Sequence, residues 1–253
     1  MSEPILSVRG LTKTFKLQGR EDVHAVKEVS FDLFPGETLG VIGESGSGKT
    51  TLVNLITGLL PATSGSVVLG GLEVTKCRGR ELRAAWKQMQ VVFQTPTESF
   101  DPRRTLGDGI CESMRNAGLS KQAAVARAKE LLELCGLPEE FAKRYPHEVS
   151  GGQCQRAAIA RALAIEPKLL ICDEATSALD VTIQAEIIAL LVQLRQKLDM
   201  SILFICHDIA LVQQFCDRVV VMYRGEIVEE GAPSAVIAAP NNPYTQDLIN
   251  SIL

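Results

Sequence analysis

Residues 38–50 read Thr-Leu-Gly-Val-Ile-Gly-Glu-Ser-Gly-Ser-Gly-Lys-Thr, and this stretch decides the fold. Its first half has the apolar character of a buried strand, and a glycine-rich segment follows at once. The residues after that segment, 51–59, carry apolar side chains at helical spacing. A strand, a glycine-rich loop and a helix in immediate succession predict an α/β fold built on a parallel sheet.

The loop matches the pattern G-x-x-x-x-G-K-[ST] of a phosphate-binding P-loop. Glycines let backbone N–H groups curl around a polyphosphate, and the following helix presents its positive end to that charge. Lys49 is expected to reach the β- and γ-phosphates, and the Thr50 hydroxyl to bind Mg²⁺. A chance glycine-rich turn would lack the strand before it and the helix after it. The predicted nucleotide-binding residues of this segment are Gly43, Glu44, Ser45, Gly46, Ser47, Gly48, Lys49, Thr50 and Thr51.

Two acidic residues follow the apolar run of residues 169–172. Asp173 and Glu174 would emerge at the carboxyl end of a buried strand, where ligands bind in open α/β sheets. We expect Asp173 to hold Mg²⁺ through water and Glu174 to act as general base on the attacking water. Without the P-loop, two acids at this place would more simply begin a helix.

Two further features lie beyond the P-loop. Residues 149–153 read Val-Ser-Gly-Gly-Gln before an apolar helix, so Ser150 and the glycine N–H groups would form a second anion site. His207 follows a strand at residues 202–205 and is placed to contact a γ-phosphate. A lone histidine is more often structural, and only the neighbouring motifs favour the functional interpretation.

Composition excludes several classes of protein. The chain has 253 residues, of which 46% are hydrophobic and 22% charged, which is typical of a globular protein rather than a disordered one. The net charge of −4 disfavours nucleic-acid binding. No apolar run approaches the length of a membrane helix, and residues 1–4 lack a signal-peptide layout, so we expect a cytoplasmic chain. The seven cysteines lack Cys-x-x-Cys spacing, so no metal role is expected.

The chain order alternates between strands and helices. Strands are predicted at residues 5–8, 23–26, 29–33, 38–43, 66–69, 90–93, 168–172, 201–206 and 218–222, and helices at 51–59, 183–197 and 209–215. Between about residues 102 and 145 the β-branched runs vanish. One apolar stripe there, with Ser120 as helix N-cap and Gly136 as stop, predicts a helical subdomain inserted into the α/β core.

In chain order, these motifs resemble the nucleotide-binding subunits of ABC transporters over nearly the whole length. Phe15 resembles the aromatic residue that stacks on adenine. Gln94 resembles the Q-loop glutamine, residues 149–153 the signature, and residues 177–180 the D-loop with Asp180. Val149 and Ala175 stand where leucine and proline are usual, and neither departure removes a catalytic group.

The resemblance implies an ABC-type P-loop NTPase core with an N-terminal antiparallel β subdomain and an inserted α-helical subdomain. Residues 1–253 would form one nucleotide-binding domain, with 1–101 and 151–253 as the ATP-binding core and 102–150 as the helical signature subdomain. ATP and Mg²⁺ would be bound between two subunits packed head to tail. The implied catalytic residues are Glu174, His207 and Gln94, the metal-binding residues Thr50, Gln94 and Asp173, and the residues that complete the nucleotide site Phe15, Ser150, Gly151, Gly152, Gln153 and Asp180.

Three short segments resemble the oligopeptide, dipeptide and nickel importer branch: Asp-Pro-Arg at 101–103, Tyr-Pro-His-Glu at 145–148 and Asn-Pro-Tyr-Thr at 242–245. This implies an ATPase subunit that powers import of peptides or chelated metal from the cytoplasmic face of the membrane. Its partners would be a second ATPase subunit, identical or different, two transmembrane permeases and, indirectly, an extracellular or periplasmic binding protein. The region after Gln94, through Phe100 and Arg104, would contact the permeases.

Two alternatives stay open at this point. One is an exporter or lipid-transport ATPase with the same catalytic core, which the segment at 242–245 disfavours. The other is a soluble ABC-type ATPase acting on ribosomes or DNA. A single cassette, the absence of a heptad run and the acidic net charge disfavour that reading, so no nucleic-acid partner is expected.

Overall fold

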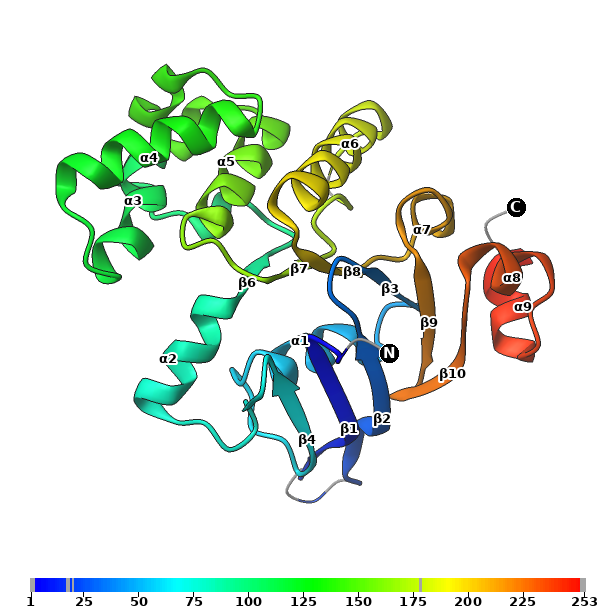
Figure 1. The fold of residues 1–253 in the computed structure, drawn as a ribbon. Helices are drawn as coiled ribbons and strands as arrows, with labels where there is room; N and C mark the ends of the chain where they lie inside the picture. Colours follow the sequence, from blue (N-terminus) through cyan, green and yellow to red (C-terminus); the bar gives the residue numbers. More distant parts are fainter. Residues whose placement is uncertain (1–2, 17–18, 20, 178, 251–253) are drawn as a thin grey trace.

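The computed structural model describes residues 3–16, 19, 21–177 and 179–250, and its strands form two sheets (Figure 1). The first sheet is antiparallel, as the N-terminal β subdomain requires. Its order is β2 (Val23–Leu33), β1 (Leu6–Phe15), β4 (Ser64–Leu69) and β5 (Leu72–Glu73).

The second sheet carries the parallel strands that the sequence predicts. Its order is β10 (Glu226–Gly231), β9 (Arg218–Tyr223), β3 (Thr38–Ile42), β8 (Ser201–Ile205), β7 (Leu169–Asp173) and β6 (Met89–Val92). Only β10 runs antiparallel to its neighbour. Every residue of β3, β7 and β8 is buried, as expected of central parallel strands covered on both faces.

The helices are distributed unevenly around the sheets. Three of them, α3 (Leu106–Asn116), α4 (Lys121–Leu134) and α5 (Gly151–Leu163), form a group at the upper left of Figure 1. The others are α1 (Lys49–Ile56), α2 (Gly79–Gln88), α6 (Val181–Leu198), α7 (Ile209–Phe215), α8 (Pro233–Ala238) and α9 (Pro243–Asn250), with 3₁₀ turns at Thr97–Ser99, Glu139–Lys143 and Pro146–Glu148.

The predicted ends of α4 are confirmed. The Ser120 hydroxyl accepts a hydrogen bond from the N–H of Ala123 at 3.2 Å, and Gly136 follows the helix with φ 75°. The buried residues of α4 and α5 belong to one apolar cluster that continues into the parallel sheet. The helical group is therefore packed onto the α/β core without a break in the hydrophobic interior.

Several predicted boundaries were wrong. The two strands expected at 23–26 and 29–33 are one strand, β2, in which Glu28 takes a left-handed φ of 49° where the pairing with β1 shifts register. The first strand extends beyond residue 8 to Phe15, and α1 ends at Ile56. The helix α2 was missed because Ala85 is its one buried residue, which leaves no apolar stripe to detect.

The topology brings the ends of three strands together. In the register, Ile205 of β8 lies between Val41 of β3 and Asp173 of β7. The P-loop follows β3, Glu174 follows β7 and His207 follows β8. Neighbouring parallel strands end at one edge of the sheet, so these three segments converge on one site.

Candidate nucleotide-binding site

The P-loop fits its place only with glycine at two positions. A Cβ added to Gly43 would lie 2.2 Å from the carbonyl oxygen of Met222. One added to Gly48 would lie 2.3 Å from the carbonyl oxygen of Ala25, and Gly48 also has φ 107°. The loop therefore lies directly against the backbone of β2 and β9, and its curled shape is built into the fold.

Lys49 is the buried cation beneath this loop. Its side-chain Nζ donates hydrogen bonds to the carbonyl oxygens of Gly43 at 2.7 Å and Glu44 at 2.8 Å, and the residue is 5% exposed. Burial lowers the pKa of Lys49, although the nearby Glu174 carboxylate opposes that shift. No ion pair involving Lys49 occurs within the described residues. The loop thus holds a positive charge suited to a polyphosphate.

Asp173 is a buried acid with one orphaned carboxylate oxygen. It ends β7, and its Oδ1 has no hydrogen-bond partner in the described part of the chain. Burial, reinforced by the adjacent Glu174, raises the pKa of Asp173 to about 6, against the opposing charge of Lys49. An orphaned carboxylate oxygen of this kind fits Mg²⁺, which is commonly held by one or two carboxylates together with water and substrate phosphates. Groups of three or more His, Cys, Asp or Glu able to hold a metal do not occur among the described residues.

A cavity of about 540 Å³ joins most of the predicted P-loop residues to Glu174. Phe15 pairs in the sheet with Val23, a cavity residue, but is itself absent from the described lining, and the Nζ of Lys13 lies 5.1 Å from the centroid of its ring. Sequence reasoning missed His24, Lys27 and Arg224, whose positions on strands and a turn carry no motif. The cavity is lined by Val23, His24, Ala25, Lys27, Ser45, Gly46, Gly48, Lys49, Thr50, Thr51, Glu174, Arg224 and Gly225.

Glu174 is held by its backbone. It has a left-handed φ of 50°, and its N–H donates to the carbonyl oxygen of Ile205 at 3.0 Å. Gln94 lies close to it through an intermediary: its Nε2 donates to the hydroxyl of Ser177 at 3.1 Å. The Ser177 hydroxyl donates in turn to the carbonyl oxygen of Glu174 at 3.0 Å. The structure thus brings Gln94 beside the predicted general base.

Two other predicted residues, His207 and Asp180, are not among the described residues that line the cavity. His207 is exposed and is absent from the described lining. Asp180 caps α6, its Oδ1 accepting from the N–H of Ile183 at 3.0 Å. Ala178, the second residue of the predicted D-loop, lies outside the described residues.

The signature residues form a separate hollow of about 440 Å³. Ser150 caps α5 by accepting from the N–H of Gln153 at 3.3 Å, while the Gln153 side chain accepts from the N–H of Ser150. A Cβ on Gly152 would lie 2.6 Å from a methyl carbon of Ile183, so this turn packs closely on α6. Within one chain, the signature does not contribute to the described lining of the P-loop cavity.

Residues 26–177, more than half of the chain, match the family model for the ABC transporter. The chain belongs to the ABC transporter family. This confirms the predicted resemblance and the predicted fold class. It also explains why the P-loop, the acids after β7 and the signature occur together in one chain.

Two kinds of relative support the assignment of this ABC cassette. It is 47% identical over 257 residues to the glutathione import ATP-binding protein GsiA of Escherichia coli O157:H7 and of Shigella dysenteriae serotype 1 (strain Sd197). Each alignment covers 99% of this chain and 41% of the relative, so the chain spans about two fifths of the length of these curated relatives.

Solved cassettes have the same fold. The dimeric ATP-binding cassette MJ0796 bound to ADP and Pi matches with a TM-score of 0.82 and 31% identity, covering 90% of this chain and 98% of that one. The protein cbiO1 from Clostridium perfringens, part of the ABC transporter complex cbiONQ, matches with a TM-score of 0.84 and 30% identity. That match covers 94% of this chain and 92% of cbiO1.

Proposed function

We propose that this cassette binds Mg²⁺ and ATP at the P-loop and hydrolyses ATP to power import of a peptide-like substrate. The observation that carries the proposal is that Lys49, buried without an ion pair among the described residues, and Asp173, buried with one orphaned carboxylate oxygen, lie at one edge of the sheet. A fold accepts two such groups at a cost in stability, and a bound polyphosphate with its cation offsets that cost.

Each residue then has a distinct task. The P-loop N–H groups and Lys49 hold the phosphates, and Phe15 stacks on the base. Thr50, Gln94 and Asp173 would hold Mg²⁺, which when bound neutralises charge on the phosphates. Glu174 accepts the proton of the attacking water, and its left-handed backbone directs the side chain into the cavity. His207 completes the γ-phosphate environment once the dimer closes.

A head-to-tail dimer explains the separate signature hollow. Ser150, Gly151, Gly152, Gln153 and Asp180 would complete the nucleotide site of a second cassette. The N–H groups at the start of α5 are the anion-binding element they supply. The dimeric state of MJ0796 bound to ADP and Pi supports this arrangement. Within one chain, we propose that residues 102–150 form the helical signature subdomain and that residues 1–101 and 151–253 form the ATP-binding core.

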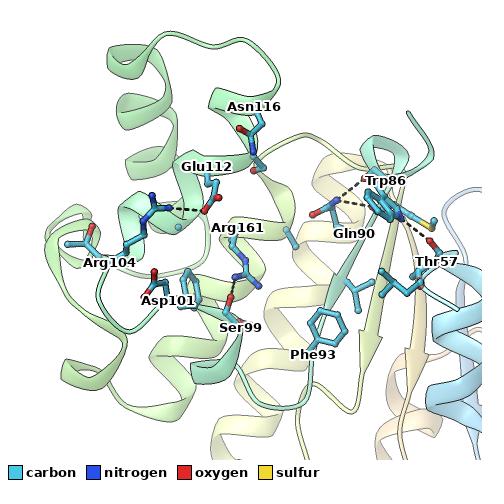
Figure 2. A pocket seen from close by; sticks show the side chains of 18 residues that line it. Thr57, Trp86, Gln90, Phe93, Ser99, Asp101, Arg104, Glu112, Asn116 and Arg161 are labelled. Atoms are coloured by element: carbon cyan, nitrogen blue, oxygen red, sulfur yellow. Dashed lines mark hydrogen bonds and ion pairs between the residues drawn. The ribbon is translucent and has the colours of Figure 1, made fainter. Parts of the chain in front are cut away.

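A second hollow, of about 420 Å³, is suited to a permease segment. Figure 2 shows the Phe93 ring and the Trp86 indole across from the ion pair of Arg104 and Glu112, whose Nη1 and Oε2 are 3.1 Å apart. The guanidinium of Arg161 lies 4.5 Å from the centroid of the Phe100 ring at its floor. An apolar, aromatic lining with a charged rim fits an amphipathic helix.

This hollow lies where the region after Gln94 was expected to meet the membrane subunits. No helix in the described part of the chain is long and apolar enough to cross a membrane. On the likeness to import ATP-binding proteins and to a part of the cbiONQ complex, we propose a peripheral position on the cytoplasmic face of the cell membrane, with two permease subunits and a second cassette. An extracellular or periplasmic binding protein would supply the cargo indirectly.

The proposed cargo is peptide-like rather than chelated nickel. The relatives that align over 99% of the chain are named for import of glutathione, a peptide-like molecule. Because the cassette holds its nucleotide and not the cargo, this part of the proposal rests on the likeness to those relatives.

The test is a pull-down of the tagged full chain in mild detergent, compared with a Phe93→Ala variant. Recovery of two multi-span proteins and a second cassette is expected, and the variant should lose the multi-span proteins. Leu119→Ala is the matched control, because Leu119 is also exposed and apolar but is absent from the described lining of the hollow. Recovery with ribosomes or DNA alone would refute the transport assignment. Loss in both variants would refute the docking hollow.

A further inference from the structure

The C-terminal helix contacts the P-loop directly. Tyr244 lies in the first turn of α9, and its Oη accepts a hydrogen bond from the backbone N–H of Glu44 at 2.9 Å. Glu44 is the second residue of the P-loop, 200 positions earlier in the chain. Residues 242–245, which resemble a segment of the importer branch, carry in this structure a contact that the proposed function does not use.

The ring of Tyr244 is held in place by a second aromatic ring. It stacks on the ring of Tyr223, the last residue of β9, with centroids 4.0 Å apart and an angle of 27° between the planes. The same strand end reaches the loop through its backbone, because the N–H of Gly225 donates to the carbonyl oxygen of Ser47 at 2.9 Å. The last residue of β9 therefore supports Tyr244, and the turn that follows it supports the P-loop.

The segment before α9 is fixed as well. The side-chain Oδ1 of Asn242 accepts the N–H of Tyr244 at 2.9 Å. The carboxylate of Glu229, on β10, accepts the backbone N–H groups of Asn241 at 2.8 Å and Asn242 at 3.1 Å. Figure 1 shows α9 beside β9 and β10 at the right of the molecule. The Tyr244 hydroxyl is thus placed by three hydrogen bonds and one stacked ring pair.

We infer that Tyr244 is a positioning residue for the P-loop: its hydroxyl holds the Glu44 amide and so preorganises the loop for a nucleotide. This rests on the proposed nucleotide binding. Tyr244 is absent from the described lining of the nucleotide cavity, so it acts through Glu44 and not on the ligand. A loop already held in its binding shape loses less conformational freedom when it binds. The position of α9 thereby sets nucleotide affinity.

The test compares Tyr244→Phe with Tyr223→Phe in the full chain. Both variants lose one hydroxyl and keep both rings. The Tyr223 hydroxyl makes no hydrogen bond within the described residues, which makes Tyr223→Phe the matched control. Hydrogen–deuterium exchange of the nucleotide-free protein reports on residues 43–48, titration with a fluorescent ATP analogue gives affinity, and thermal unfolding gives Tm.

For Tyr244→Phe we expect exchange at residues 43–48 to rise and affinity for the ATP analogue to fall, each by about 3- to 10-fold, the range set by one hydrogen bond. Tyr223→Phe should match wild type in both, and the Tm of Tyr244→Phe should fall by no more than the roughly 2–4 °C that one lost hydrogen bond sets. Unchanged exchange and affinity in Tyr244→Phe would overturn the inference. So would equal changes in both variants, or exchange that rises no more at residues 43–48 than in the rest of the chain. A wild-type chain that binds no nucleotide would refute the proposed function, while the exchange measurement would still test the Tyr244 contact.

Discussion

The Nε2 of Gln94 lies 3.1 Å from the hydroxyl oxygen of Ser177, and that hydroxyl lies 3.0 Å from the carbonyl oxygen of Glu174. Gln94 and Ser177 are 83 positions apart in the sequence, so their contact joins two distant segments of the chain. The backbone of the proposed general base is therefore connected to the segment that leads toward the proposed permease hollow. A shift of Gln94 would therefore be transmitted to Glu174 through the Ser177 hydroxyl.

We predict that Ser177→Ala slows ATP hydrolysis about 3- to 10-fold while ATP affinity changes little. The variant removes both hydrogen bonds of the Ser177 hydroxyl, the one it donates to the carbonyl oxygen of Glu174 and the one it accepts from Gln94, each typically contributing about 1 kcal/mol. Steady-state hydrolysis and equilibrium ATP binding separate the two effects. Ser234→Ala is the control, because Ser234 is exposed on α8. A loss of affinity with unchanged turnover would contradict the predicted role of this connection.

Glu174→Gln should retain ATP binding and lose hydrolysis by about 100-fold or more, because the amide cannot accept the proton of the attacking water. It keeps the shape of the side chain, so the cavity is preserved. Single-turnover hydrolysis and nucleotide binding are the measurements, with Glu133→Gln as a control at an exposed position on α4. Wild-type turnover in Glu174→Gln would remove Glu174 from the role of general base.

Asp173→Asn should stabilise the nucleotide- and metal-free protein near neutral pH. Burial raises the pKa of Asp173 from 3.8 to about 6, so its ionisation opposes folding. Below pH 3.8 the carboxyl is protonated in both the folded and the unfolded state, and the free energy of unfolding has its full value. That value falls as pH rises through about 6, where the carboxyl ionises in the folded protein. We expect an advantage of about 1–3 kcal/mol for the variant at pH 7.5.

The measurement is chemical denaturation of both proteins in EDTA at several pH values. The difference between them should shrink as pH falls from 7 toward 4, because wild-type Asp173 then becomes neutral as well. A constant difference across that range would show that the substitution acts through packing. Added Mg²⁺ and ATP should stabilise the wild type more than the variant.

The sequence predicted the P-loop, the acids after β7 and a mostly parallel sheet because each depends on short, strongly patterned segments. The P-loop motif has fixed spacing, and β3, β7 and β8 are continuous apolar runs. What escaped prediction depends on contacts between distant segments. Lys27 and Arg224 line the cavity only because β2 and the turn after β9 place them there, and the bond from Glu44 to Tyr244 joins residues 200 positions apart. The bulge at Glu28 and the weakly apolar α2 carried no local signal.

The two central P-loop glycines provide the sharpest test of the loop geometry. Gly46 and Gly48 both have positive φ, 82° and 107°, so alanine at either costs roughly 1 kcal/mol or more in backbone strain. A Cβ on Gly46 has nothing within 4 Å, whereas one on Gly48 would lie 2.3 Å from the carbonyl oxygen of Ala25. Gly48→Ala should therefore lower the free energy of unfolding of the nucleotide-free protein by several times as much as Gly46→Ala, since β2 must move away. Equal losses in denaturant titrations would mean that the loop does not pack against β2 in this way.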